Sequence, residues 1–146
     1  MMDIKRVFIA IICLLAFSAC DHPQQQQSTA HTVNIKRFGM VTGLKPEKMA
    51  YYKKLHAAAW PGVLKKIKAC HIRNYSIYIQ KIEGKYFLFS YFEYVGTDFD
   101  KDMALMAADT TTQRWWKETN PTQNPLPEAA AQQKIWQNMQ EVFHTD

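Results

Sequence analysis

The chain has 146 residues, a length that suits one domain and hardly allows two. Hydrophobic residues make up 47% of it and charged residues 21%, which excludes a disordered chain. The net charge is +5, and setting residues 1–19 aside leaves 16 basic and 12 acidic residues. This excess is mild and the basic residues are scattered, so a nucleic-acid-binding protein is not expected.

The first 19 residues have the pattern of a signal peptide. Lys5 and Arg6 precede an unbroken apolar run over residues 7–17. A membrane-spanning helix needs about 20 apolar residues, so this run is too short to be an anchor helix. Residues 1–19 are therefore predicted to be removed on export.

Cys20 lies where a bacterial lipobox places its cysteine, after two small residues. We predict that it is lipidated and becomes the new N-terminus; ordinary cleavage after Ala19 is the alternative. Residues 20–32 are polar and glutamine-rich, as expected of a flexible tether. The sequence thus predicts a lipid-anchored protein of the bacterial cell envelope, with a globular domain over residues 33–146.

The domain begins with a strand and two helices. Alternating apolar and polar residues predict the strand over 33–42. Pro46 suits the first position of a helix whose apolar residues recur every three or four positions. The pair Trp60-Pro61 ends this helix, because proline disfavours helical geometry in the residue before it. A second helix is predicted over 62–69.

A hairpin follows, and its second strand indicates how the protein assembles. The strands 74–82 and 85–95 are separated by Glu83-Gly84, a pair typical of an antiparallel hairpin. Both faces of the second strand are mostly apolar, so neither is expected to face bulk water. Helices can cover one face of so small a sheet, and a second copy of the chain is expected to cover the other. The sequence therefore predicts a homodimer.

The remaining elements complete a β–α–β–β–α–β order. They comprise helices over 98–107 and 110–116, an irregular loop with three prolines over 120–127, a short helix over 129–134 and a last strand over 139–144. This order is the split-βαβ, ferredoxin-like arrangement of an α+β domain.

His56 is the most promising candidate for chemistry. It lies one helical turn after Tyr52 and one turn before Trp60, so the three side chains share a helix face where the helix breaks. A lone helical histidine is more often structural than catalytic. An imidazole grouped with a phenol and an indole, however, suits the wall of a pocket.

Trp115 and Trp116 are the second candidate feature. Neighbouring helical residues point about 100° apart, so one indole is expected in the core and the other at a surface that stacks against a sugar ring. The alternative is that both indoles only pack in the core or at a subunit contact. Tyr75, in the first hairpin strand, is a further candidate, although strand tyrosines are usually packing residues. The sequence motifs of phosphate, dinucleotide and zinc sites are absent, so no metal or organic cofactor is expected.

Four stretches, taken together, resemble the L-rhamnose mutarotase family, and the resemblance covers nearly all of residues 34–146. It implies a ferredoxin-like α+β domain that dimerises into an α/β barrel. It also implies that His56 is the proton donor. The stretches are Tyr52 with His56, Trp60 and Pro61; Asn74 to Tyr78; Thr112 to Trp116; and Glu141 to His144. The implied sugar-binding residues are Tyr52, Tyr75, Trp115 and Trp116.

The activity implied by the resemblance is that of an aldose 1-epimerase. Such an enzyme interconverts the α and β anomers of a 6-deoxy-L-hexose, here L-rhamnose or L-fucose, by acid/base ring opening and closure. Familiar members of the family are cytoplasmic and lack a signal segment. Two other functions stay open: a non-catalytic deoxysugar-binding lipoprotein, and a small monooxygenase on the same dimeric barrel.

Overall fold

The computed structural model describes residues 34–145. The predicted signal peptide over 1–19, the tether over 20–32 and the lipidation site Cys20 lie outside the described residues. The elements, in chain order, are β1 (Lys36–Leu44), the short 3-10 helix η1 (Pro46–Lys48), α1 (Met49–Ala57), α2 (Pro61–Ala69), β2 (Ile72–Ile82), β3 (Lys85–Tyr94), α3 (Phe99–Ala107), α4 (Thr110–Thr119), η2 (Asn120–Thr122), β4 (Gln123–Asn124), α5 (Pro127–Ala131) and β5 (Gln137–Met139).

The strands form one antiparallel sheet in the order β2-β3-β1-β4, and β5 also pairs with β1. Glu83 and Gly84 join β2 to β3 with φ angles of 48° and 81°. Two left-handed residues in a row are what a two-residue hairpin turn requires. The predicted α+β class and the β–α–β–β–α–β order are confirmed.

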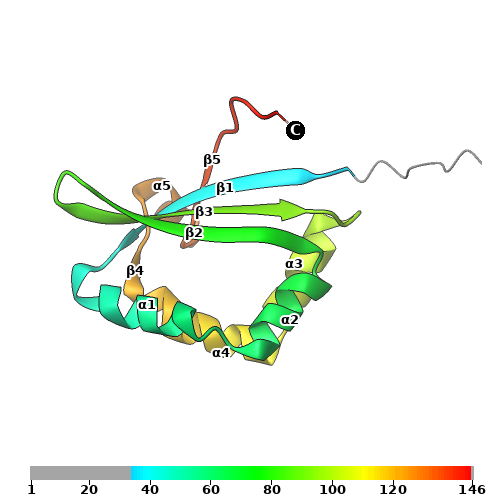
Figure 1. Ribbon diagram of the computed structural model, residues 1–146, viewed down its shortest axis with the longest axis horizontal. Coiled ribbons are helices and arrows are strands. Elements are labelled where there is room, and N and C mark those ends of the chain that lie inside the picture. Colours follow the sequence, from blue (N-terminus) through cyan, green and yellow to red (C-terminus); the bar gives the residue numbers. More distant parts are fainter. Residues whose placement is uncertain (1–33, 146) are drawn as a thin grey trace, which may run out of the picture. The chain divides into compact units, whose positions relative to one another are not determined.

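Helices α1 to α4 lie on one side of the curled sheet, and the C-terminal segment runs off its other side (Figure 1). From Leu88 onward the even-numbered residues of β3 are buried: Leu88, Ser90, Phe92 and Tyr94 are each at most 5% exposed. The odd-numbered residues from Phe87 onward are half-buried. Side chains of a strand alternate between faces, so one face of β3 packs under the helices and the other remains partly exposed.

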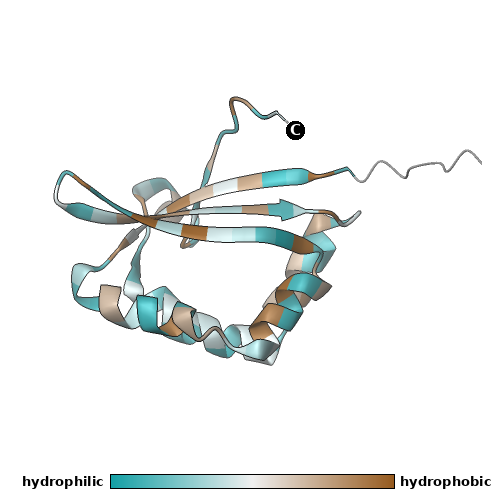
Figure 2. Ribbon diagram, viewed as in Figure 1, coloured by the Kyte–Doolittle hydropathy of each residue, from teal (hydrophilic) through white to brown (hydrophobic). Residues whose placement is uncertain are grey.

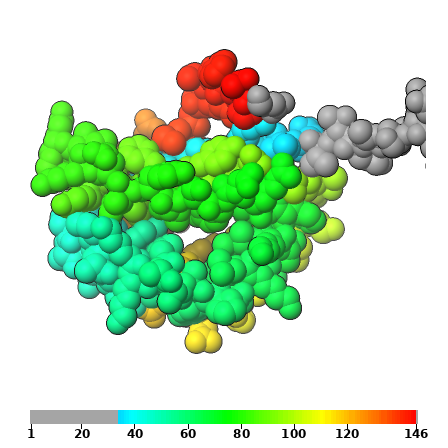
Figure 3. Space-filling model, in the orientation of Figure 1, coloured from blue at the N-terminus to red at the C-terminus, as the bar shows by residue number. Residues whose placement is uncertain are grey.

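The hydrophobic core on the helix side is divided into two clusters. Leu44, Tyr52 and Leu88 centre the first, near α1. Ile72, Phe92 and Tyr94 centre the second, against α2 and α3. Figure 2 shows the apolar residues spread over both strands and helices. In the space-filling view the molecule is hollowed between β2 and the helices α1 and α2 (Figure 3).

Breaks and caps follow local chemistry. Trp60 is extended, with φ −64° and ψ 132°, and Pro61 opens α2, which confirms the predicted break. Asp109 caps α4: its carboxylate accepts a hydrogen bond from the Thr112 backbone N–H at 2.8 Å. A carboxylate is also favoured there by the helix dipole.

Two predictions near the C-terminus are wrong. The proline-rich stretch 120–127 is not wholly irregular, because η2 and β4 lie within it. Its prolines flank β4, so the strand keeps its backbone N–H groups for pairing with β1. The last strand is not 139–144: pairing with β1 ends at Met139, and beyond it Val142 and Phe143 are 89% and 79% exposed.

Candidate active site

A cavity of about 560 Å³ lies between the sheet and the helices, and parts of both core clusters line it. This volume is within the roughly 300–1,000 Å³ of typical ligand pockets. All five site residues predicted from the sequence line it, so the structure brings them together: Tyr52, His56, Tyr75, Trp115 and Trp116.

Helix α1 supplies Tyr52 and His56 to the cavity. Their rings stack with centroids 4.1 Å apart, as expected for residues one turn apart on a helix. Trp115, on α4, meets His56 edge-on at 5.2 Å and Trp60 at 5.4 Å. The helix break at Pro61 thus leaves Trp60 packed against α4, and the imidazole is enclosed on two sides by aromatic rings.

Hydrogen bonding fixes the tautomer of His56. Its Nδ1 lies 2.9 Å from the backbone carbonyl oxygen of Tyr52. A carbonyl oxygen only accepts, so Nδ1 carries a proton and donates it. Burial lowers the pKa of His56, and the hydrogen bond to the Tyr52 carbonyl opposes this only in part. The imidazole is therefore neutral at pH 7, with a lone pair on Nε2 that can take up a proton.

A bulge in β2 places Tyr75. The register with β3 shifts between Arg73 and Ser76, and Asn74 has a left-handed φ of 50°. A bulge re-aims the side chains beside it, and here Tyr75 meets Phe92, a residue of the buried face, edge-on at 5.6 Å.

Both phenols of the cavity stay protonated at neutral pH. Burial raises the pKa of Tyr75 to about 12. Burial also raises the pKa of Tyr52, and the neighbouring Tyr75 adds to this rise. Tyr52 and Tyr75 can therefore donate hydrogen bonds to oxygens of a ligand but do not serve as bases near pH 7.

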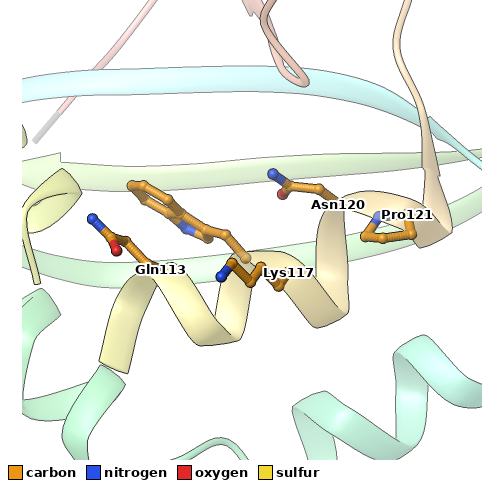
Figure 4. A pocket seen from close by; sticks show the side chains of 5 residues that line it. Gln113, Lys117, Asn120 and Pro121 are labelled. Carbon is orange, nitrogen blue, oxygen red and sulfur yellow. The ribbon is translucent and has the colours of Figure 1, made fainter. Parts of the chain in front are cut away.

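The two adjacent indoles of α4 differ as predicted. Trp115 is 7% exposed and belongs to the core, whereas Trp116 is 36% exposed. Trp116 also borders a shallower groove of about 430 Å³, whose other lining residues are shown in Figure 4: Gln113, Lys117, Asn120 and Pro121.

Sequence reasoning missed Gln123. It lies in β4, is 5% exposed and lines the cavity. Its amide oxygen Oε1 has no hydrogen-bond partner among the described residues. The stretch between prolines gave no signal for it, since a two-residue strand leaves no periodicity to detect. Residues 134–136, after α5, also line the cavity and were not anticipated.

A second polar cluster lies outside the cavity lining. His71 Nδ1 is 2.8 Å from Asp102 Oδ2, and the Tyr94 hydroxyl donates to the same oxygen at 2.7 Å. The Tyr94 hydroxyl in turn accepts the backbone N–H of Asp98 at 3.0 Å. His71 thus holds α3 through Asp102. Within residues 34–145 no group of three or more His, Cys, Asp or Glu side chains is arranged to hold a metal ion.

Comparison with known proteins gives a consistent result. The family model described as L-rhamnose mutarotase matches residues 37–145. An L-rhamnose mutarotase of Oceanobacillus iheyensis is 29% identical over 77% of this chain and 100% of its own length. That of Ligilactobacillus salivarius is 30% identical over 75% of this chain and 97% of its own length. The L-rhamnose mutarotase of Bacillus subtilis is 27% identical over 77% of this chain and 100% of its own length.

These relatives correct the predicted location. The family match occupies residues 37–145, and two of the relatives are covered over 100% of their length by 77% of this chain. The family match does not extend over the predicted leader and tether, and the prediction of a cell-envelope location is wrong. Along the described stretch of the chain, no helix is both long and apolar enough to cross a membrane.

The fold agrees with the same family. A crystal structure of the L-rhamnose mutarotase FA22100 from Formosa agariphila superposes with a TM-score of 0.56 at 20% identity, over 76% of this chain and 99% of that one. At this identity the superposition speaks for the fold alone. The family assignment comes from the sequence model, which matches well over half of the residues. The chain belongs to the L-rhamnose mutarotase family.

Proposed function

We propose that the cavity interconverts the α and β anomers of L-rhamnose. One observation carries this proposal: a neutral imidazole, with Nδ1 already donating, lies between a phenol and an indole in a cavity of ligand size. Family membership supports it, and the chain is accordingly an isomerase acting on a carbohydrate.

His56 is the acid/base group. Ring opening breaks the C1–O5 bond, and the proton of the anomeric hydroxyl passes to Nε2 of His56. The ring oxygen takes a proton from a second donor, for which the hydroxyls of Tyr52 and Tyr75 are the candidates in the cavity. After rotation about C1–C2, the O5 hydroxyl attacks C1 and gives its proton back to the second donor, while the imidazolium returns its proton to O1. Positioning and proton transfer are sufficient for this chemistry.

Trp116 is the indole that stacks on the sugar. It lines the cavity while remaining 36% exposed, so a face of the ring is available to an apolar sugar surface. Trp115 supports His56 from the side and fills the core.

The homodimer belongs to the same proposal. Phe89 and Tyr91 lie on the face of β3 opposite its buried residues, and Tyr78, which pairs with Phe89, is 63% exposed. A second copy packed on this face would cover the apolar patch. We expect a dimer in light scattering and a monomer for Phe89→Lys. A wild-type monomer at micromolar concentration would contradict this part of the proposal.

Anomer exchange measured by NMR tests the activity. L-rhamnose, L-fucose and D-glucose are compared, with saturation of one anomeric proton and detection of the other. We expect the protein to accelerate exchange of L-rhamnose well above the spontaneous rate and to leave D-glucose at background. Tight binding of L-rhamnose without faster exchange would instead identify a sugar-binding protein.

A further inference from the structure

Two polar atoms of the cavity wall have no hydrogen-bond partner among the described residues. They are the Tyr52 hydroxyl and Gln123 Oε1, on residues that are 4% and 5% exposed. A buried polar group without a partner is costly, so native proteins rarely leave one unless something else satisfies it. Both residues line the cavity, where a ligand can supply that partner.

The backbone holds Gln123 in place without help from its side chain. Gln123 pairs with Leu44 of β1, and the neighbouring pair is Asn124 with Gly43. A Cβ on Gly43 would lie 2.5 Å from the Asn124 carbonyl oxygen, so only glycine lets β4 come this close.

The residue before Gln123 is anchored as well. The Thr122 hydroxyl donates to the Thr119 carbonyl at 2.6 Å, and the Lys45 N–H donates to the Thr122 carbonyl at 3.0 Å. Thr122 itself is 1% exposed. The fold therefore fixes the backbone of Gln123 beside the cavity, while the side-chain oxygen stays without a partner among the described residues.

The Gln123 side chain lies near Tyr52, since it acts on the pKa of that phenol and lowers it against the larger effect of burial. Oε1 only accepts, so the partner that it lacks must be a donor. A ring hydroxyl of a sugar is a donor of suitable size, and the same sugar carries further hydroxyls that can meet Tyr52.

We propose that Gln123 is a specificity-determining residue that accepts a hydrogen bond from one ring hydroxyl of the sugar, next to the hydroxyl bound by Tyr52. This inference rests on the proposed function for the identity of the ligand. It assigns Gln123 to substrate recognition and not to proton transfer.

Two variants test it. Gln123→Met removes the amide at similar volume, and Gln123→Asn keeps an amide but withdraws its oxygen from the cavity. Gln80→Met is the matched control, since Gln80 is an exposed glutamine of β2 that bonds the Lys81 carbonyl. KM and kcat are measured by NMR exchange, L-rhamnose affinity by tryptophan fluorescence, and Tm by circular dichroism.

We expect both Gln123 variants to weaken L-rhamnose binding and raise KM by about 3- to 10-fold, the range of one hydrogen bond, with kcat little changed. Tm should stay the same or rise in Gln123→Met, because an unpartnered buried oxygen is lost. Gln80→Met should match wild type. Unchanged KM and affinity would overturn the proposal, and so would failure of both Gln123 variants to fold, since the side chain would then support the fold.

Deoxy analogues identify the contact. L-rhamnose analogues lacking the hydroxyl at C2, C3 or C4 are titrated against wild type and Gln123→Met. Wild type should bind one of them about 3- to 10-fold more weakly than L-rhamnose, and the variant should lose this preference. A variant that discriminates as wild type does would contradict the proposal. If wild type binds L-rhamnose without exchanging anomers, the proposed function fails, and the affinity measurements still decide the role of Gln123.

Discussion

The two histidines of the domain that flank α2 are in opposite situations. His71 is part of a cluster in which Asp102 and Tyr94 find their hydrogen-bond partners inside the protein. His56 lies in a cavity where the Tyr52 hydroxyl and Gln123 Oε1 have no such partner among the described residues. Both clusters combine a histidine, a tyrosine and another polar group.

The difference separates a structural role from a functional one. Polar groups that satisfy one another hold elements together, as Asp102 holds α3 to the end of α2 through His71. Polar groups that line a cavity and have no partner among the described residues can bind a ligand there. Residue type alone does not distinguish the two clusters.

The largest expected effect is at His56. His56→Ala should reduce L-rhamnose exchange about 10²- to 10⁴-fold, the range for loss of a general acid/base, because no other described group of the cavity is a base near pH 7. NMR exchange measures the rate, and circular dichroism confirms the fold. His71→Ala should exchange at nearly the wild-type rate. A folded His56→Ala protein with wild-type exchange would make His56 structural.

The adjacent indoles sharpen the comparison within one helix. Trp115→Ala should lose about 3–5 kcal/mol of unfolding free energy, because Trp115 is 7% exposed and contacts both His56 and Trp60. Trp116→Ala should lose far less stability and instead raise KM for L-rhamnose. Urea denaturation and exchange kinetics measure the two effects. Equal stability losses in the two variants would refute the division of roles.

Acid stability tests the His71 cluster. Hydrogen bonds from Tyr94 first, and then from His71, lower the pKa of Asp102 below its ordinary 3.8. Because its pKa is lower in the folded state, the Asp102 carboxylate stabilises the fold at pH values above the ordinary carboxyl pKa. This contribution is lost as the pH falls through the pKa of the folded state. Asp102→Asn should therefore have a lower Tm at pH 7 and a smaller further loss on acidification, with exchange retained. An unchanged Tm at pH 7 would contradict the structural role.

The rate of anomer exchange should rise with pH and should not fall again near neutrality. Burial lowers the pKa of His56 from its ordinary 6.5, and the neutral imidazole is the active base. The kcat/KM for L-rhamnose should thus rise with pH through a pKa below 6.5 and then stay level through neutrality, because the pKa values of Tyr52 and Tyr75 are raised. A rate that falls between pH 6 and pH 8 would indicate that the protonated imidazole is required.

Much of the fold could be read from the sequence because its signals are local. Pro61 disfavours helical geometry at Trp60 whatever the rest of the fold does. The φ angles of Glu83 and Gly84 likewise suit a hairpin turn without help from distant residues. The long strands were predicted to within a few residues. β4 and β5 are set instead by pairing with β1, a long-range interaction that a stretch of two or three residues does not reveal.

The site was partly predictable for a similar reason. Tyr52 and His56 share a helix face, which their spacing shows directly. Tyr75 lines the cavity because of a β-bulge that the sequence pattern does not reveal. Gln123 depends on the approach of β4 to Gly43, which exists only in the folded chain. The hydrogen bond of the His71 ring likewise depends on Asp102, which is 31 residues away in sequence.

The imidazole NMR signals test the contrast between the two histidines most directly. The ¹H–¹⁵N correlations of the histidine rings, assigned with His56→Ala and His71→Ala, are recorded with and without L-rhamnose. We predict that His56 is a neutral Nδ1–H tautomer at pH 7 whose Nε2 signal shifts on addition of L-rhamnose, while the His71 signals stay unchanged. Sugar-dependent shifts at His71 with none at His56 would contradict the account.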